Sequence, residues 1–242
     1  SGSSVSLSAD GSTVAIGAPY NDGNGDGSGH VRIYQYINSS WQQLGTDIDG
    51  EAQYDESGSS VSLSADGSTV AIGAPYNDGN GDGSGHVRVY QYIDSSWQQL
   101  GTDIDGEARV DSSRSYVSLS ADGSTVAIGA RQNDGNGDQS GHVRIYQYIN
   151  SSWQQLGTDI DGEAQYDYSG SSVSLSADGS TVAIGAPYND GNGDGSGHVR
   201  IYQYINSSWQ QLGTDIDGEA QYDESGSSVS LSADGSTVAI GA

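Results

Sequence analysis

The residues best suited to chemistry lie in an acidic, glycine-rich stretch that recurs along the chain. In its first copy, Asp22, Asn24 and Asp26 stand two residues apart, and Gly27 follows them. Oxygen ligands at alternate positions on a tightly turned backbone can converge on a hard cation, which makes Ca²⁺ the candidate cofactor. The residues of these candidate calcium sites are Asp22, Asn24, Asp26, Asp78, Asn80, Asp82, Asp134, Asn136, Asp138, Asp190, Asn192 and Asp194.

The alternative for this stretch is a solvated turn that joins two strands and holds no ion. Asn, Asp and Gly favour turns for local backbone reasons. The full calcium-loop motif is also incomplete, because its twelfth position needs Glu and holds Ile33. In the third copy the glycine after the acids becomes Gln139. We therefore favour the turn and keep calcium as the competing interpretation.

Two further sets of polar residues recur. The stretch "TDIDGEA" puts Asp47, Asp49 and Glu51 at alternate positions, where they could share a cation or face water, and a charge run more often faces water. A lone His follows each acidic stretch, with no second His or Cys beside it, which makes a poor metal site. Nothing resembles a nucleophile elbow or a Ser-His-acid set, so the sequence predicts no enzyme. The histidines are His30, His86, His142 and His198.

These residues recur because the chain is an internal repeat with a period of 56 residues. The string "SGSSVSLSADGSTVAIGA" begins at Ser1, Ser57, Ser169 and Ser225, and a diverged copy begins at Ser113. Four full units and a partial fifth follow one another without insertions. The predicted repeats are residues 1–56, 57–112, 113–168 and 169–224, and the partial repeat is 225–242.

Each unit has the pattern of four antiparallel strands. "SVSLS" alternates apolar residues with serines, and "STVAIGA" follows the turn signal Asp10-Gly11. "HVRIYQY" at 30–36 predicts a third strand, and "WQQLGTDI" at 41–48 predicts the fourth. Four strands in a repeat of this size are typical of a propeller blade. The predicted fold class is all-β, with tandem four-stranded antiparallel β-propeller-like blades, four full units and a terminal half-unit.

The repeat resembles the FG-GAP repeat of integrin α-subunit propellers. Gly17-Ala18-Pro19 matches the Gly-Ala-Pro half, and Ser57-Gly58 stands at the Phe-Gly position. Unit three departs in both halves, with Gly129-Ala130-Arg131 and Ser113-Arg114. The resemblance implies propeller blades that are usually extracellular and that bind or adhere rather than catalyse. In calcium-binding members the acidic loop precedes the Gly-Ala-Pro strand, whereas here it follows, so those ligands do not carry over.

The composition excludes several classes of partner. The net charge is −25, from 32 acidic residues against seven arginines, and such a surface repels nucleic acid and anionic membranes. The sequence has no apolar run of about 18 residues, so we expect no membrane insertion. The chain has no cysteine, which excludes disulfide and thiolate chemistry.

Two features recur in the turn that precedes the fourth strand. Asn-Ser-Ser in this turn is an acceptor for N-glycosylation in a secreted protein, and unit two has Asp94 instead. The tryptophan that follows is either an anchor between blades or an exposed platform for sugars, and its large apolar area favours the anchor. The predicted glycosylation sites are Asn38, Asn150 and Asn206, and the tryptophans are Trp41, Trp97, Trp153 and Trp209.

Two functions compete. Both ends carry an ordinary repeat with no atypical cap, which predicts end-to-end self-association of chains, or of units in a longer polypeptide. We therefore expect a non-enzymatic structural protein, extracellular or on a cell surface, that forms a fibre, sheath or array. The alternative is an adhesion or ligand-binding propeller that engages a glycan or an extracellular protein, with or without calcium. Divergence between units would mark its site, and it gathers at Arg109, Val110, Arg114, Tyr116, Arg131, Gln132 and Gln139.

Overall fold

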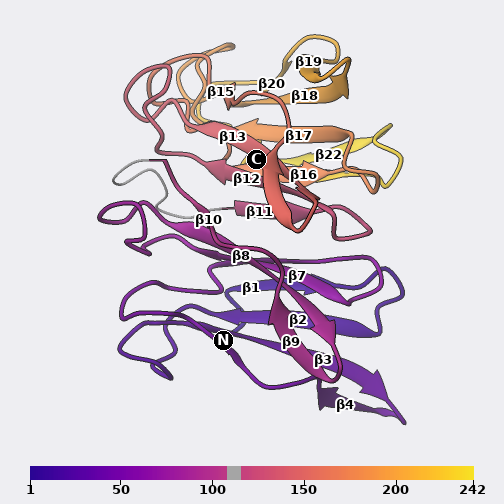
Figure 1. Cartoon of the computed structure of the whole chain (residues 1–242). Helices are drawn as coiled ribbons and strands as arrows, with labels where there is room; N and C mark the ends of the chain where they lie inside the picture. The colour runs from indigo at the N-terminus through magenta and orange to yellow at the C-terminus, as the bar shows by residue number, and fades with distance from the viewer. Residues whose placement is uncertain (108–115) are drawn as a thin grey trace.

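In the computed structural model, which describes residues 1–107 and 116–242, the chain forms a row of antiparallel sheets, one for each unit (Figure 1). Every regular element in those two ranges is a strand, and neither range contains a helix long and apolar enough to cross a membrane. The indigo first unit lies in the lower part of the view, and the yellow last hairpin lies in the upper part beside the first two strands of unit four. The predicted fold class of four repeated sheets and a terminal half-unit is confirmed.

The first sheet sets the pattern for the rest. It contains β1 (Ser4–Leu7), β2 (Thr13–Ala18), β3 (His30–Ile37), β4 (Ser40–Gln43) and β5 (Ile48–Asp49). Strands β1 to β4 pair in chain order, and β5 pairs with the first two residues of β3. The connection between β2 and β3 and the one after β5 therefore lie at the same end of the sheet.

The later units repeat this arrangement. The hairpin of the partial fifth unit, β21 with β22, forms a sheet of two strands. The remaining strands are β6 (Ser60–Leu63), β7 (Thr69–Ala74), β8 (His86–Ile93), β9 (Ser96–Gln99), β10 (Ile104–Asp105), β11 (Tyr116–Leu119), β12 (Thr125–Ala130), β13 (His142–Ile149), β14 (Ser152–Gln155), β15 (Ile160–Asp161), β16 (Ser172–Leu175), β17 (Thr181–Ala186), β18 (His198–Ile205), β19 (Ser208–Gln211), β20 (Ile216–Asp217), β21 (Ser228–Leu231) and β22 (Val238–Gly241).

The fourth strand is interrupted, whereas the sequence predicted one continuous strand over residues 41–48. Strand β4 pairs with the second half of β3, and β5 pairs with its first half. Between them Gly45 adopts a φ of 74°, which favours glycine. A Cβ added at Gly45 would lie 2.8 Å from Cδ1 of Trp97 in the next unit. The interruption therefore makes room for that indole.

The apolar core lies between successive sheets. Val31 and Ile33 on one face of the first sheet pack with Leu63 and Ile72 of the second, and all four are buried. The same cluster forms between the second and third sheets and between the third and fourth. A sheet with a neighbour on each side therefore buries its two faces against different sheets, which is how propeller blades pack.

The tryptophans fasten one unit to the one before it. Trp97 is partly buried, and its Nε1 donates a hydrogen bond of 2.8 Å to the carbonyl of Leu44 in unit one. Trp153 and Trp209 make the same bond to the preceding units. Trp41, which has no preceding unit to contact, is 49% exposed. The prediction of a core anchor between blades is confirmed for three of the four.

The serines of the first strand also join neighbouring units. Ser4 Oγ accepts a hydrogen bond from the backbone N–H of Val61 at 3.0 Å, and Ser6 Oγ accepts one from Leu63 at 2.9 Å. Later units repeat these bonds. A backbone N–H buried between sheets needs an acceptor, and these hydroxyls supply it. The serines in "SVSLS" therefore face the next unit.

Two glycines of adjacent units meet backbone to backbone. Gly17 in β2 faces Gly58, which precedes β6 and has a φ of 88°. A Cβ added at Gly17 would lie 2.0 Å from the carbonyl oxygen of Gly58. The pairs Gly129 with Gly170 and Gly185 with Gly226 repeat the contact. In each pair, the first glycine belongs to the Gly-Ala-Pro motif and the second stands at the Phe-Gly position. The divergent Ser113-Arg114 lies outside the described residues.

The hairpin turn of each unit is held by its aspartate. In unit four, Ser176 Oγ and the backbone N–H of Ser180 donate to Asp178 Oδ1 at 2.7 and 2.9 Å, and these donors hold the pKa of Asp178 below its ordinary value. The equivalent serine donors lower the pKa of Asp234 to about 2. Gly179 follows with a φ of 72°, so the hairpin turns at the predicted Asp-Gly pair.

We predict that Gly129→Ala destabilises the fold by about 3 kcal/mol, because the new methyl group would overlap a backbone oxygen that cannot rotate away. The control is Gly241→Ala at the equivalent position of the half-unit, where the nearest atom is the hydroxyl of Ser228. That hydroxyl can turn aside, so we expect a much smaller loss. Urea unfolding measures both variants. Equal losses would show that the contact between units does not set the cost.

We also predict that stability falls as the pH drops from about 4 to 2, because the folded pKa of the turn aspartates lies below the unfolded value. In that window the unfolded chain binds more protons, so acid favours unfolding. Replacing Asp10, Asp178 and Asp234 with Asn should flatten the pH dependence of the urea midpoint between those values. A slope as steep as that of the parent chain would contradict the role given to these turns.

Candidate functional site

The acidic stretch forms the connection between β2 and β3, and its side chains hold that connection together. Asp22 Oδ1 accepts a hydrogen bond from the N–H of Gly27 at 2.8 Å, and Asp26 Oδ2 accepts one from Gln53 at 3.2 Å. Asn24 Nδ2 donates to the two backbone carbonyls that follow β5, at 2.9 and 3.1 Å. These bonds are those of a structural turn, and calcium binding here stays a prediction. Comparable bonds form at Asp78, Asn80, Asp134, Asn136, Asp138, Asp190, Asn192 and Asp194.

The predicted glycosylation sites lie in the two-residue turn between the third and fourth strands. Asn38 is exposed. Asn38 and Asn150 both have a φ of 51°, and Asp94 of unit two has a φ of 50°. Asn and Asp tolerate this left-handed conformation better than other residues with side chains. The turn therefore explains the residue type by itself, and glycosylation of Asn38, Asn150 and Asn206 stays a prediction.

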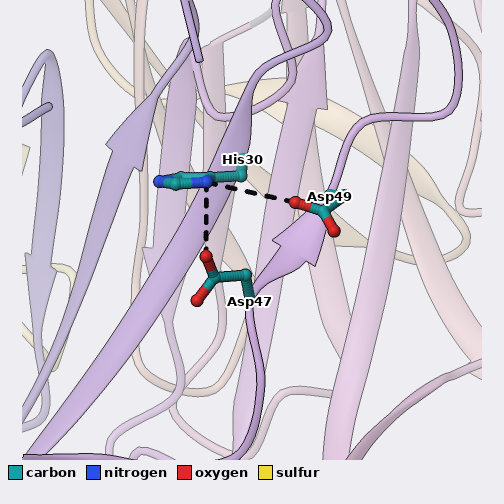
Figure 2. Close-up of side chains that lie close together, drawn as sticks. All are labelled: His30, Asp47 and Asp49. Carbon is teal, nitrogen blue, oxygen red and sulfur yellow. Dashed lines mark ion pairs between the residues drawn. The ribbon is translucent and has the colours of Figure 1, made fainter. Parts of the chain in front are cut away.

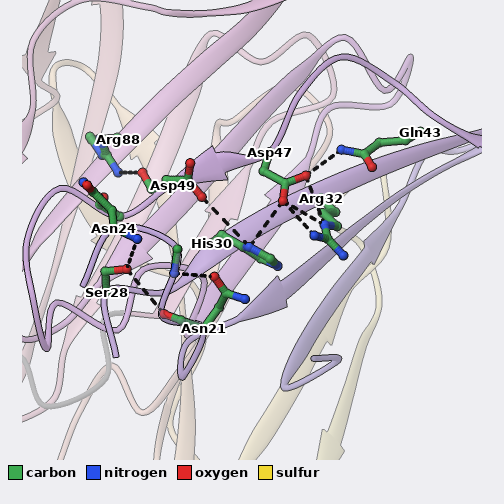
Figure 3. Close-up of polar contacts among 11 residues, drawn as sticks. Asn21, Asn24, Ser28, His30, Arg32, Gln43, Asp47, Asp49 and Arg88 are labelled. Atoms are coloured by element: carbon green, nitrogen blue, oxygen red, sulfur yellow. Dashed lines mark hydrogen bonds and ion pairs between the residues drawn. The ribbon is translucent and has the colours of Figure 1, made fainter. Parts of the chain in front are cut away.

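A second set of polar residues gathers where the third strand begins. Figure 2 shows His30 Nδ1 directed at Asp47 and Asp49, at 3.5 and 4.0 Å from their nearest carboxylate oxygens. In this first unit Arg32 binds Asp47 through both of its oxygens, at 2.8 and 3.0 Å (Figure 3). Gln43 adds a bond of 2.6 Å to the same carboxylate. Here the hydrogen-bonding capacity of Asp47 is taken up within its own unit.

From the second unit on, the cluster draws residues from two units. His86 Nδ1 lies 3.9 Å from Glu51 Oε2 of unit one and 3.8 Å from Asp103 Oδ2 of its own unit. Arg88 Nη1 lies 3.3 Å from Glu51 Oε1, and its Nη2 donates to the carbonyl of Asp49 at 2.8 Å (Figure 3). The alternating acids of "TDIDGEA" therefore serve two sites, because the aspartate at its start faces its own unit's His and the glutamate faces the next.

The histidines of these clusters are neutral at neutral pH. Burial, aided by the neighbouring Arg88, lowers the pKa of His86. In the same way burial and Arg144 lower the pKa of His142 to about 4. A neutral imidazole nitrogen has a lone pair, which can accept a hydrogen bond or ligate a metal. The equivalent clusters are Glu107 with His142 and Asp159, and Glu163 with His198 and Asp215.

Sequence reasoning missed these clusters because it judged each histidine within its own unit. Glu51 and His86 belong to different units, so no local motif contains both. The signal that could have found them is the constant period, which puts the acidic strand of every unit beside the histidine strand of the next.

One pocket contains a residue, Tyr168, that the other units do not have at the equivalent position. It has a volume of about 400 Å³ and lies between units three and four. Its wall includes Tyr166, Tyr168 and Tyr188, and its rim carries the carboxylates of Asp190 and Glu224. Aromatic faces beside carboxylates suit a polar ring compound such as a sugar, because the rings stack and the carboxylates accept hydrogen bonds or act as a general base.

Tyr168, which is peculiar to unit three, forms part of the wall of this pocket. The Tyr168 ring lies 5.3 Å from the Tyr188 ring, edge to face, and the guanidinium of Arg131 lies 5.8 Å from the Tyr168 ring centre. The hydroxyl of Tyr168 is hydrogen-bonded to Gln139 Oε1 at 2.5 Å. Arg131, with Gln132, lines an adjoining hollow against the same two tyrosines. Four departures from the repeat therefore lie close together, namely Arg131, Gln132, Gln139 and Tyr168.

The sequence located most of this divergence but overlooked its most central member. Tyr168 is the last residue of unit three and stands where unit one has Glu56. A comparison of the last residues of the units would have found it. Tyr116 lines a different pocket, together with residues of units one and two. The divergent Arg109, Val110 and Arg114 lie outside the described residues.

The fold resembles that of two solved structures. The periplasmic gluconolactonase PpgL of Pseudomonas aeruginosa superposes with a TM-score of 0.64 at 19% identity, over 99% of this chain and 64% of that one. A candidate 6-phosphogluconolactonase of Bacteroides uniformis gives 0.59 at 12% identity, over 98% and 57%. The chain thus spans less than two thirds of either structure, and at these identities the likeness establishes the fold. No curated protein matches the sequence.

These neighbours overturn the expectation of a non-enzymatic protein, both as a structural fibre and as an adhesion propeller. One neighbour is named as a gluconolactonase and the other as a candidate for a related activity, so this fold gives no argument against catalysis. That expectation rested on the absence of a nucleophile elbow and of a Ser-His-acid set, which excludes only some kinds of catalysis. Tyr168, which is peculiar to unit three, also makes one pocket unlike the others. Self-association stays a prediction.

A family model described as the FG-GAP repeat matches residues 46–90 and 158–202. Each match runs from the last strand of one unit into the third strand of the next. The first match includes Gly58 and Gly73-Ala74-Pro75. The resemblance seen in the sequence is confirmed for these two segments, which lie in a β-propeller-like array.

Proposed function

We propose that the protein is a lactonase-type enzyme that hydrolyses a neutral sugar lactone in the pocket between units three and four. The observation that carries the proposal is the asymmetry of that pocket, where Tyr168 departs from the repeat and packs against Tyr188. Two further departures, Arg131 and Gln139, contact Tyr168. A fold related to a gluconolactonase supports the same reaction class. Enzymes usually bind small molecules in one formed pocket with a few polar groups, and this pocket has that character.

The pocket suits the shape and polarity of a sugar lactone. Tyr188 is 43% exposed, so its ring can stack on the ring of a sugar. Tyr168 is held in place by Gln139 and packs against Tyr188, which orients both rings before a ligand arrives. Carboxylates at the rim accept hydrogen bonds from sugar hydroxyls. Binding therefore needs little rearrangement of the protein.

Hydrolysis would follow from general-base catalysis at the rim. The exposed carboxylate of Glu224 takes a proton from water while the water oxygen attacks the lactone carbonyl carbon. The ring carbon–oxygen bond then breaks, the departing ring oxygen gains a proton, and the product is the open hydroxy acid. The guanidinium of Arg131, next to the Tyr168 wall, adds positive potential that favours the developing oxyanion.

Charge separates the two kinds of lactone that the structural neighbours suggest. The chain carries a net charge of −25, which repels a phosphorylated substrate over a distance set by ionic strength. A neutral lactone pays no such penalty. We therefore favour a lactone such as glucono-δ-lactone over its 6-phosphate.

We also propose that the protein acts outside the cytoplasm, in the cell envelope or beyond it. The first of the two neighbours is named as periplasmic. The FG-GAP resemblance led to the same expectation from the sequence. Fractionation of cells that produce the protein tests this, and recovery with the cytoplasmic enzymes would contradict it.

We predict that the purified chain speeds acid release from glucono-δ-lactone above the spontaneous rate in a pH-stat, and does so less well with the 6-phosphate. Glu224→Gln should lower the rate about 100-fold or more, because the amide cannot take up a proton. The matched control is Glu56→Gln, which changes the same position of unit one, away from Tyr168.

Two outcomes would contradict the proposal. A parent chain that never exceeds the spontaneous rate would remove the activity altogether. If Glu224→Gln and Glu56→Gln lowered the rate of hydrolysis equally, the pocket between units three and four would not be the site of the reaction. Melting temperatures of both variants serve to show that the comparison is made on folded protein.

A further inference from the structure

The clusters that join successive units have the geometry of metal sites. In the cluster of Glu51, His86 and Asp103, one nitrogen and two carboxylate oxygens lie within 4.8 Å of one another. His86 Nδ1 is 3.9 Å from Glu51 Oε2 and 3.8 Å from Asp103 Oδ2. These separations are too long for direct hydrogen bonds, and an ion between the atoms would bridge them.

The buried imidazole gives an independent sign of a ligand. The side chain of His86 is 1% exposed, and its Nδ1 has no hydrogen-bond partner although it is aimed at two carboxylates. His198 has the same burial and the same unpartnered Nδ1. Buried polar atoms are nearly always paired, so an unpaired one aimed at two anions indicates a missing partner. A cation satisfies the nitrogen and both carboxylates together.

Neighbouring side chains hold the outer carboxylate oxygens and leave the inner ones turned to the histidine. Gln99 Nε2 donates to Asp103 Oδ1 at 2.6 Å, and Oδ2 of the same group faces His86. Arg88 Nη1 lies 3.3 Å from Glu51 Oε1, and Oε2 faces His86. Such contacts to the far side of a ligand are how proteins orient metal-binding groups.

The ligand set indicates which metal fits. Ca²⁺ prefers six to eight oxygen ligands, whereas one imidazole with two carboxylates is a set that Zn²⁺ accepts, with water completing the shell. A tetrahedral Zn²⁺ with bonds of about 2.0–2.2 Å holds its ligand atoms about 3.3–3.6 Å apart. The observed 3.8 and 3.9 Å need only a few tenths of an ångström of closure.

We propose that Zn²⁺ binds between successive units, at Glu51, His86 and Asp103 and at the equivalent clusters of units three and four. The proposal does not rest on the lactonase activity, since none of the residues in these clusters lines the tyrosine-lined pocket. The first unit is the exception, because Arg32 and Gln43 occupy the oxygens of Asp47. We therefore expect three zinc ions for each chain. The equivalent clusters are Glu107, His142, Asp159 and Glu163, His198, Asp215.

The test is to count zinc ions on the full chain after chelator treatment, by native mass spectrometry and by calorimetric titration with ZnCl₂. Asp103→Asn should lower the count from three to two, because an amide is a weaker ligand than a carboxylate. The matched control is Asp47→Asn, the same change at the same position of unit one, which should keep three. Asp103 is 32% exposed in its side chain, which makes this a mild change for folding.

Each outcome decides the proposal. A parent chain that binds no Zn²⁺ at micromolar concentration would overturn it, as would three ions retained by Asp103→Asn. Equal loss of an ion from Asp47→Asn and Asp103→Asn would also overturn the assignment to clusters between units. If Asp103→Asn melts below the parent chain without metal, Asp215→Asn provides the second measurement, with the same expected loss of one ion. Ca²⁺ that competes equally for these sites would overturn the choice of zinc.

Discussion

The close approach of two glycine backbones sets the distance between successive units. Gly17 and Gly58 leave no space for a Cβ, since the carbonyl of one lies where the methyl group of the other would be. Because of this spacing, the serine hydroxyls of β1 can reach the backbone of β6, and the indole of Trp97 can reach the carbonyl of Leu44. The contact also explains why a Gly-Ala-Pro motif and a glycine near the start of the next unit occur together.

The same spacing creates the polar clusters, and it does so in every unit that has a predecessor. Arg32 and Arg88 are equivalent residues with different partners, because only Arg88 has an earlier unit to contact. Repetition therefore multiplies a structural arrangement but cannot by itself produce a single selective pocket. That requires differences between units, and a few side chains of unit three are enough, because Tyr168 and Arg131 project onto one surface.

Local patterns in the sequence predicted the strands and turns well. The alternation in "SVSLS" and the Asp-Gly turn are contained in a few adjacent residues, so they need no knowledge of neighbours. The break at Gly45 was missed because its cause is Trp97, a residue of the next unit. The cluster at His86 was missed for the same reason, and Tyr168 because its role depends on Tyr188 across the boundary. What failed was the step from one unit to the pair of units.

Why a histidine stands at this buried position cannot be answered from its recurrence in every unit. Units one and four are identical in sequence, so a residue that all copies share has been copied recently and its repetition says little about use. The physical argument is stronger. A buried polar atom without a partner costs about 1–3 kcal/mol, and the Nδ1 atoms of both His86 and His198 would incur that cost. An apolar residue would fill the same space between sheets without it. The fold therefore does not need an imidazole there. The reason for its presence is then the pair of carboxylates that face it, which with the imidazole form a set of ligands for a cation.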